Sequence, residues 1–369
     1  GRDRTFFFFS YEGLRLRQPF TTEPLEVPTV AARNAATGVL RDLLNAFPLP
    51  TRRFSAAEEA DGVVPYITNF TNPARLDATS FRIDHTINNR VSVFGRYNYA
   101  PSQDLQRARF CAASCVADLT FLTETFTVGS TQVFSSKLSN DLRVNFSKSK
   151  ANQTYFIDTY GGAVVPPQSS LYPSFTSGAN GYVYIEVNPS GSNTLSDGLF
   201  SDNIQRQFNI VNSTSYVFGG HALKFGVDYR RLAPVSFSGT YKRAFLPDSI
   251  QALIATAANP NGEPAFAQLI APQITLRPIY HNFSFFAQDT WRVNPRLTLT
   301  YGLRYEIVPA PDEENGNLPL SVSGLVEGTN DLRNVAVLPT RQKFYETTYN
   351  NFAPRVGAAY QLFASPGRE

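Results

Sequence analysis

The chain is poor in several residue types, and each shortage narrows what it can do. Its 369 residues include no methionine, two cysteines, one tryptophan and three histidines. The histidines are far apart, and the sequence lacks HExxH, GxSxG and glycine-rich phosphate motifs. We therefore expect no catalytic residue, no metal site and no cofactor, and we predict that the protein is not an enzyme.

Charge is also scarce, and it is not clustered. Charged residues make up 17% of the chain, against roughly 25% in an average soluble domain. The 33 basic and 30 acidic residues are scattered without a basic stripe, so no nucleic-acid partner is expected. No apolar run approaches the ~18 residues of a membrane helix. If the protein crosses a membrane, it must do so with strands.

Aromatic residues and a period of two are what the chain has in quantity. It contains 30 phenylalanines and 18 tyrosines. The clearest periodic segment is RLTLTYGLRYEIVP, in which Leu297, Leu299 and Tyr301 alternate with polar residues. Such alternation predicts a strand with one apolar and one polar face. About ten segments of this kind occur, joined in pairs by short turns at 88–89, 135–139, 219–221, 293–295 and 364–367.

Long connections alternate with these short turns along the whole chain. They are expected at about 19–77, 101–118, 158–202, 238–278 and 309–348. In an antiparallel meander all short turns then lie at one rim and all long loops at the other, as in transmembrane barrels. We predict an all-β, antiparallel up-and-down transmembrane β-barrel, present in part, as one domain over residues 1–369. Short helices are expected in the long loops, over 29–47, 249–260 and 264–272.

The opening stretch TFFFFSYEGLRLR departs from this alternation. By parity, Phe7 and Phe9 belong to the apolar face, while Phe6 and Phe8 belong to the polar face that should line the barrel interior. An interior that is locally apolar predicts a lumen filled by a folded plug. The alternative is a strand buried in the core of a soluble protein.

Candidate functional positions follow from the same parity. At a tilt near 45° about ten residues span the apolar band, which puts Tyr99 and Tyr305 in an outer aromatic girdle and Trp291 in an inner one. Ordinary exposed strand aromatics are the alternative. The charged residues expected to face the lumen have three alternative roles: contact with a plug, lining of a substrate path, or formation of ion-pair ladders along the wall. They are Arg82, Asp84, Arg96, Arg143, Lys224, Asp228, Arg230, Arg304 and Glu306.

Two loop features are candidates for local chemistry. Cys111 and Cys115 are spaced C-x3-C, which predicts a disulfide in an oxidising compartment; a metal site and two free thiols are the alternatives. The acidic run 312–314, followed by Asn315 and Gly316, offers hard oxygen ligands for Ca²⁺. It lacks EF-hand spacing, so a solvated loop tip is the preferred interpretation.

Several stretches resemble the barrel of TonB-dependent outer-membrane receptors, and among them the Oar-like group. They are TFFFFSYEGLR, SFRIDHTINNRVSVFGRYNY, HALKFGVDYRR, HNFSFFAQDTWRVNPRLTLTYGLRYE and NNFAPRVGAAYQ. The resemblance implies a 22-stranded barrel with an N-terminal plug and a TonB box, of which this chain carries about half the strands and no plug. Two strand edges, at 6–17 and 352–362, would then be unpaired.

The resemblance also implies a function and a set of partners. It implies an integral protein of a bacterial outer membrane that moves a large or scarce ligand inward or outward, energised by a TonB–ExbB–ExbD-type partner that acts on the plug. Outer-membrane lipid and an unknown ligand are the remaining partners. A passive porin is the first alternative, and a secreted β-rich adhesin or carbohydrate-binding module is the second.

Overall fold

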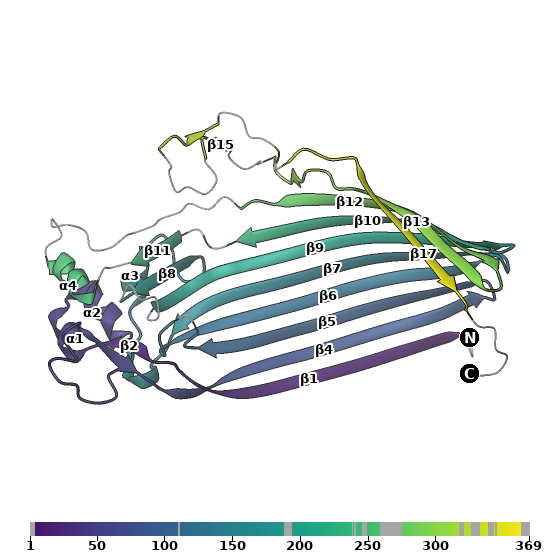
Figure 1. Ribbon diagram of the computed structural model, residues 1–369. Helices are drawn as coiled ribbons and strands as arrows, with labels where there is room; N and C mark the ends of the chain where they lie inside the picture. Colours follow the sequence, from purple (N-terminus) through teal and green to yellow (C-terminus); the bar gives the residue numbers. More distant parts are fainter. Residues whose placement is uncertain are drawn as a thin grey trace.

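The computed structural model describes residues 4–109, 111–187, 194–237, 239, 241–245, 249–258, 275–316, 321–325, 333–338, 343 and 345–362. One antiparallel sheet dominates it, and ten strands follow one another in chain order along its main path (Figure 1). This confirms the expected meander. The ten strands are β1 (Thr5–Thr21), β4 (Asn69–Asn88), β5 (Val91–Arg107), β6 (Cys115–Val133), β7 (Leu138–Ile157), β9 (Thr194–Phe218), β10 (His221–Phe237), β12 (Pro278–Asn294), β13 (Leu297–Ile307) and β17 (Asn351–Tyr360).

Short turns join these strands at one rim, as expected, because the turn residues favour tight reversal. Asn88 Oδ1 accepts a hydrogen bond from the Arg90 amide at 2.8 Å, and Asn294 Oδ1 accepts one from the Arg296 amide at 2.9 Å. Asparagine commonly closes turns in this way. Gly219 adopts a φ of 55°, which a residue without Cβ reaches without strain. The turn expected at 364–367 lies outside the described residues.

Most strands are longer than the ten residues expected, and three connections are correspondingly shorter. The connection predicted at 158–202 ends before Thr194. β5 continues to Arg107 and β6 begins at Cys115, so the connection predicted at 101–118 shrinks to 108–114. The connection predicted at 19–77 begins after Thr21 and ends before Asn69. The reason is that ladder hydrogen bonds continue past the alternating region into segments whose two faces are both partly buried. β9, with 25 residues, is the longest strand described.

The register shows how far the strands tilt. One row of opposed residues crosses β4, β5, β6, β7, β9, β10 and β12, and consists of Phe81, Tyr97, Phe126, Phe146, Phe208, Arg231 and His281. Asn88 lies seven residues beyond this row on β4, whereas Asn294 lies thirteen beyond it on β12. The turn rim is therefore staggered by about one residue per strand. With ~3.3 Å per residue and ~4.8 Å between strands, this stagger gives a tilt of about 35°.

At the opposite rim the long connections fold together into a compact body, which we call the loop cap (Figure 1). Phe47, Cys111, Leu171, Ile185 and Ile250 come from four different connections and belong to one buried cluster. The cap contains β2 (Leu25–Pro28), α1 (Val30–Ala35), α2 (Gly38–Asn45), β3 (Val63–Tyr66), η1 (Tyr160–Gly162), α3 (Gln168–Leu171), β8 (Gly181–Glu186), β11 (Tyr241–Phe245) and α4 (Ile250–Ala258).

The helices of the cap agree with the expected segments, with one difference. The segment 29–47 forms two helices, because Ala36 has an extended backbone that ends α1, and Thr37 precedes α2. The segment 249–260 contains α4, whereas 264–272 lies outside the described residues. Short strands β14 (Asp312–Glu313), β15 (Val322–Ser323) and β16 (Ala336–Val337) complete the described part of the connection between β13 and β17.

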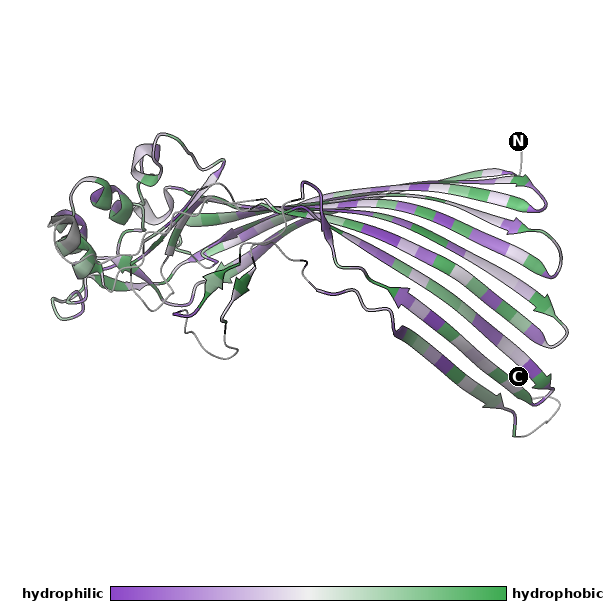
Figure 2. Cartoon of the chain, turned by 90° about the horizontal axis from the view of Figure 1, so that it is seen from above, coloured by the Kyte–Doolittle hydropathy of each residue, from purple (hydrophilic) through white to green (hydrophobic). Residues whose placement is uncertain are grey.

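The sheet is an open arc in the part of the chain that the structure describes. β1 pairs only with β4 and β17 only with β13, so each leaves one edge unpaired. Apolar and polar residues alternate along the strands toward the short-turn rim, where the sheet fans out (Figure 2). Over the described residues, no helix is long and apolar enough to cross a membrane.

Candidate functional site

The register brings all the predicted interior residues onto one face of the sheet, which we call the polar face. Directly opposed residues of neighbouring strands share a face. Phe6 stands opposite Asp84 and Phe8 opposite Arg82, and Arg82 in turn stands opposite Arg96. Following the ladder from β6 to β13 adds the remaining candidates to the same face, namely Arg143, Lys224, Asp228, Arg230, Arg304 and Glu306.

Part of the charge on the polar face is paired along single strands. Arg82 donates to both carboxylate oxygens of Asp84 at 2.7 and 2.6 Å, and its guanidinium lies 4.4 Å from the centre of the Phe94 ring. Arg304 Nε donates to Glu306 at 2.6 Å. These side chains are 38–45% exposed, so each pair stabilises the fold by at most about 1 kcal/mol. These two pairs fit the ion-pair alternative, and the role of the charged candidates as a set stays a prediction.

Other cations on this face have no counter-ion. Among the described residues Arg143, Lys224, Arg230 and Arg355 make no hydrogen bond or ion pair, whereas Asp228 already accepts from Asn209 at 2.6 Å. Sequence reasoning missed Arg355. Its position between Pro354 and Val356 in NFAPRVGAAYQ already indicates that it belongs to the polar face. Glu12, Asp141 and Asp228 lie on the same face and offset part of this charge, so the polar face keeps a small excess of positive charge, and such an excess attracts anions.

A small depression on the polar face collects two of these groups. It encloses about 200 Å³ and is lined by Phe286, Gln288, Gly302, Arg304 and Arg355 among others. Gly302 belongs to its lining, and a Cβ at this position would lie 3.0 Å from the Ala287 carbonyl oxygen of the neighbouring strand. Two guanidinium groups and an amide can hold an anionic or carbonyl-bearing group. Its volume is below the ~300 Å³ of a complete small-molecule pocket, so it is at most a subsite.

Phe6 and Phe8 form an apolar patch on this otherwise polar face. Both are 59% exposed, and the register sets them beside the charged pair of β4. No described residue covers them. Burying these two exposed phenylalanine rings against another folded protein domain would be energetically favourable.

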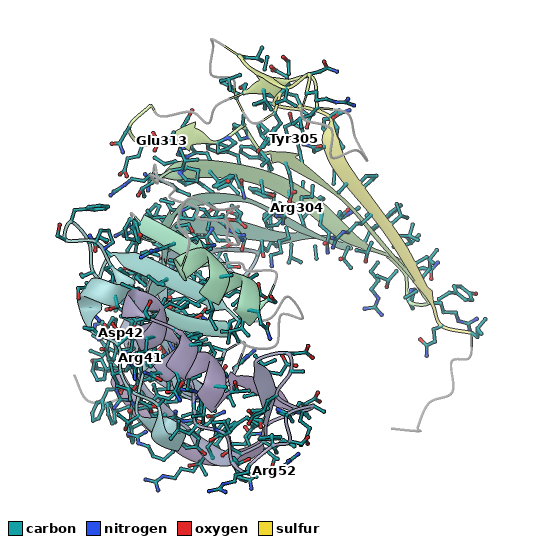
Figure 3. The ribbon with its side chains drawn as sticks, turned by 90° about the vertical axis from the view of Figure 1, so that its left-hand side faces the viewer. Arg41, Asp42, Arg52, Arg304, Tyr305 and Glu313 are labelled. Atoms are coloured by element: carbon teal, nitrogen blue, oxygen red, sulfur yellow. A yellow bond between two sulfur atoms is a disulfide. The ribbon has the colours of Figure 1, made fainter. Side chains whose placement is uncertain are left out.

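The other side, the apolar face, carries the predicted girdle residues. Tyr99 and Tyr305 each lie ten residues beyond their turns, and the Tyr305 ring stacks on Phe352 at 4.5 Å. Arg304 and Tyr305 are adjacent on β13 and so lie on opposite faces (Figure 3). Trp291 lies at the short-turn end, where its ring stacks on His221 at 5.2 Å. These positions fit two aromatic levels; the girdle role itself stays a prediction.

Asp289 is a buried acid on the apolar face that sequence reasoning did not single out. Its carboxylate lies 2.6 Å from His221 Nδ1 and accepts from the Tyr301 hydroxyl at 2.7 Å, and the residue is 5% exposed. In FSFFAQDTW the acid occupies a position at which the alternation predicts an apolar residue, and this feature could have identified it. Because Asp289 orients His221, and His221 stacks on Trp291, the acid acts as a positioning residue for the ring stack.

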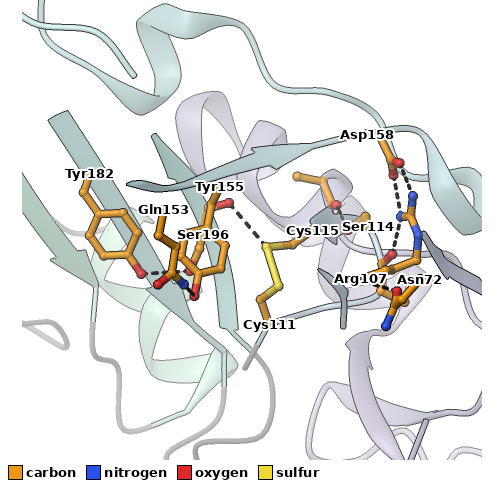
Figure 4. Close-up of a disulfide and its surroundings, with 12 residues drawn as sticks. Asn72, Arg107, Cys111, Ser114, Cys115, Gln153, Tyr155, Asp158, Tyr182 and Ser196 are labelled. Atoms are coloured by element: carbon orange, nitrogen blue, oxygen red, sulfur yellow. Dashed lines mark hydrogen bonds and ion pairs between the residues drawn. A yellow bond between two sulfur atoms is a disulfide. The ribbon is translucent and has the colours of Figure 1, made fainter. Parts of the chain in front are cut away.

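The cysteines lie in the core of the loop cap and are joined by a disulfide (Figure 4). Both are buried, and the neighbouring Ala112 amide donates to the Thr194 carbonyl at 2.6 Å. Cys115 Sγ lies 3.5 Å from the Ser196 carbonyl oxygen. The disulfide therefore closes a short loop, and the Ala112 amide inside this loop attaches it to β9.

A clamp around Arg107 joins β4 and β5 to the connection that follows β7 (Figure 4). Arg107 pairs with Asp158, its guanidinium lies 4.4 Å from the Tyr160 ring centre, and its amide donates to Asn72 at 3.0 Å. Burial alone would raise the pKa of Asp158, but hydrogen bonds from Arg107 and from the Tyr160 amide outweigh it and lower that pKa. Arg33 is also buried, which lowers its pKa to about 10 while three backbone carbonyls accept from it.

The acidic run at 312–314 has its own partners. The Arg277 amide donates to Glu313 at 3.0 Å, and the Arg277 guanidinium lies 3.3 Å from Glu314. The Asn315 amide donates to Glu313 at 2.8 Å. No group of three or more His, Cys, Asp or Glu side chains in the described ranges is arranged to hold a metal ion. The run is held by Arg277 and by the pairing of β14 with β12, so it begins as a short strand and not as the free loop tip expected.

Comparison with known proteins gives a family match and several distant structural likenesses. A model of the outer membrane beta barrel domain matches residues 36–368. No curated protein matches the chain. Similar solved structures include the outer membrane transporter YddB from Escherichia coli (TM-score 0.44, 10% identity, 69% of this chain and 30% of that one). They also include the copper transporter OprC (0.41, 11%, 79% and 34%) and the ferripyoverdine receptor of Pseudomonas aeruginosa (0.44, 9%, 98% and 40%).

The chain spans about a third of the length of the first two of these structures. At these scores the likenesses identify neither a ligand nor a partner of this chain.

Proposed function

This chain belongs to the outer membrane beta barrel domain family, and from that premise we propose that it forms part of the wall of a receptor that carries a large or scarce ligand across the outer membrane. The observation that carries the proposal is a charged polar face, with a small excess of cations, beneath a loop cap at the long-loop rim. The cap would recognise the ligand and the polar face would guide it. The integral outer-membrane setting removes the secreted adhesin as an alternative.

The two unpaired edges support a larger barrel. Lipid offers no partner for the free N–H and C=O groups of β1 and β17, so a spanning sheet must close on itself. The ten strands described have the stagger and tilt of a closed barrel. We propose that residues 1–369 are barrel strands of a TonB-dependent receptor. Further strands would complete the wall, up to the 22 that the resemblance implies.

The apolar patch supports a plug. Phe6 and Phe8 would be poorly placed in a water-filled channel, whereas a folded body inside the barrel would bury them. A TonB-type partner would act on that plug and supply the energy for transport. A passive porin is the second candidate, since the charged polar face would also suit a wet pore.

Liposome swelling separates the two candidates. The full-length protein would be reconstituted in liposomes, and hexose would serve as the probe. A plugged receptor gives no swelling, and removing the region that precedes the barrel produces swelling. Rapid swelling of liposomes that hold the intact protein would refute the plugged receptor and favour the porin. A second arm measures binding of the intact protein to the C-terminal domain of a TonB-type protein; no binding would refute the energised mechanism alone.

A further inference from the structure

Four cations stand close together on the apolar face, where sequence reasoning placed no function. Lys148 and Lys150 lie on β7, Arg206 on β9 and Arg231 on β10, and we call them the basic cluster. The register puts them on the face that carries Phe126, Phe146 and Phe208. In the membrane this face meets lipid, so the basic cluster is not part of the passage described above.

The basic cluster lies at one height. Lys148 and Arg231 are ten residues from the strand ends at the short-turn rim, and Lys150 and Arg206 are twelve. At the tilt found above, each residue climbs about 2.7 Å, so the cluster lies about 27–32 Å above the rim. Phe146, eight residues from its turn, lies one step below. The cations therefore begin where the apolar band ends, at the level of lipid headgroups.

The cluster is electrostatically unfavourable as it stands. Lys148 stands directly opposite Arg206, and Arg231 lies one diagonal step away from Arg206. Like charges in opposed positions destabilise a sheet. Glu124 neutralises Lys148 at 3.0 Å and Asp202 lies 3.4 Å from Lys150. Two acids against four cations leave an excess of two positive charges.

The excess resides on the arginines. Arg206 and Arg231 make no hydrogen bond or ion pair within the ranges that the structure describes, although they lie on neighbouring strands. A guanidinium presents a planar fork of donors that matches a phosphate. An anion bridging the two arginines would satisfy both and relieve the repulsion from Lys148.

We propose that the basic cluster binds the phosphate groups of an anionic lipid in the outer leaflet of the outer membrane. Phe126 and Phe146, which lie nearer the short-turn rim, contact the acyl chains, and the two arginines contact the headgroup. A lipid, not a soluble anion, is the occupant because the cations directly border a surface that is buried in the bilayer. The bound lipid would fix the depth and the rotation of the barrel in the membrane.

The test uses native mass spectrometry on the full-length protein. The probes are a bis-phosphorylated outer-leaflet glycolipid and the same glycolipid with its phosphates removed enzymatically. The wild type should retain the phosphorylated form preferentially. Each cation near an anionic lipid surface contributes about fivefold, so Arg206→Gln with Arg231→Gln should lower retention roughly 10- to 30-fold. Arg206→Lys with Arg231→Lys should restore most of it.

The matched control removes two charges elsewhere. Arg41→Gln with Arg53→Gln changes exposed cations of the loop cap by the same amount and should leave lipid retention unchanged. Equal retention of the two glycolipids by the wild type would overturn the proposal. So would an unchanged preference in the glutamine variant, provided that its heat-induced gel shift shows a folded barrel. Loss of retention in the cap control would show that net charge, not this cluster, attracts the lipid.

Discussion

Changing one small side chain to arginine on either face of the sheet tests the assignment of faces directly. Val144 on β7 lies opposite Val128 and Ile210 on the apolar face. It is six residues from the strand end at the turn rim, which places it about 16 Å into the apolar band. An arginine near the bilayer midplane of a barrel costs roughly 2–4 kcal/mol. We expect Val144→Arg to lower the folding equilibrium roughly 30- to several-hundred-fold.

Val211 is the matched control, since it undergoes the same substitution at nearly the same height on the neighbouring strand. It stands between Arg143 and Asp228 on the polar face. There the new arginine meets one like and one opposite charge and remains hydrated, so Val211→Arg should change stability by less than about 0.5 kcal/mol.

The assay is equilibrium unfolding of the full-length protein in lipid vesicles, followed by denaturant titration and the heat-induced gel shift of folded barrels. The expected result is a marked loss for Val144→Arg and little change for Val211→Arg. Equal losses would mean that both faces are buried against protein. A larger loss for Val211→Arg would reverse the assignment of lipid and interior, and with it the roles given to the charged residues.

Two further predictions concern the loop cap. Replacing Cys111 and Cys115 by serine reopens a loop of five residues, which should destabilise the cap by about 2 kcal/mol and accelerate limited proteolysis of 108–114, while the gel shift of the barrel stays unchanged. Because the folded pKa of Asp158 is below its unfolded value, its pairing with Arg107 should stabilise the cap above about pH 4 and weaken as the pH falls through the folded pKa. Proteolysis measured from pH 7 to pH 3 should show this loss, and Asp158→Asn should remove the pH dependence; a variant that keeps it would refute the assignment.

Much of the sheet could be predicted from the sequence because strands with two different faces impose a strict parity. Asn88 and Asn294 mark turns by local chemistry, and alternation assigned Arg143 and Tyr305 to opposite faces. Both features depend only on neighbouring residues.

What could not be predicted depends on contacts between distant segments. The shared core of the loop cap joins Phe47 to residues of three other connections, and no local pattern identifies such partners. The ends of β5 and β6 were misplaced because Arg107 is held by Asp158, which is far away in sequence. Arg355 and Asp289 were missed because each stands alone among neighbours of the opposite character.

The common core of the loop cap has a mechanical consequence. Four connections that bury one set of side chains cannot swing outward one at a time, because moving any of them exposes the packing surface of the others. A molecule that passes beneath the cap must therefore move the four connections together or pass beside them. Movement of the cap should therefore depend on its attachments to the strands below and not on any single connection.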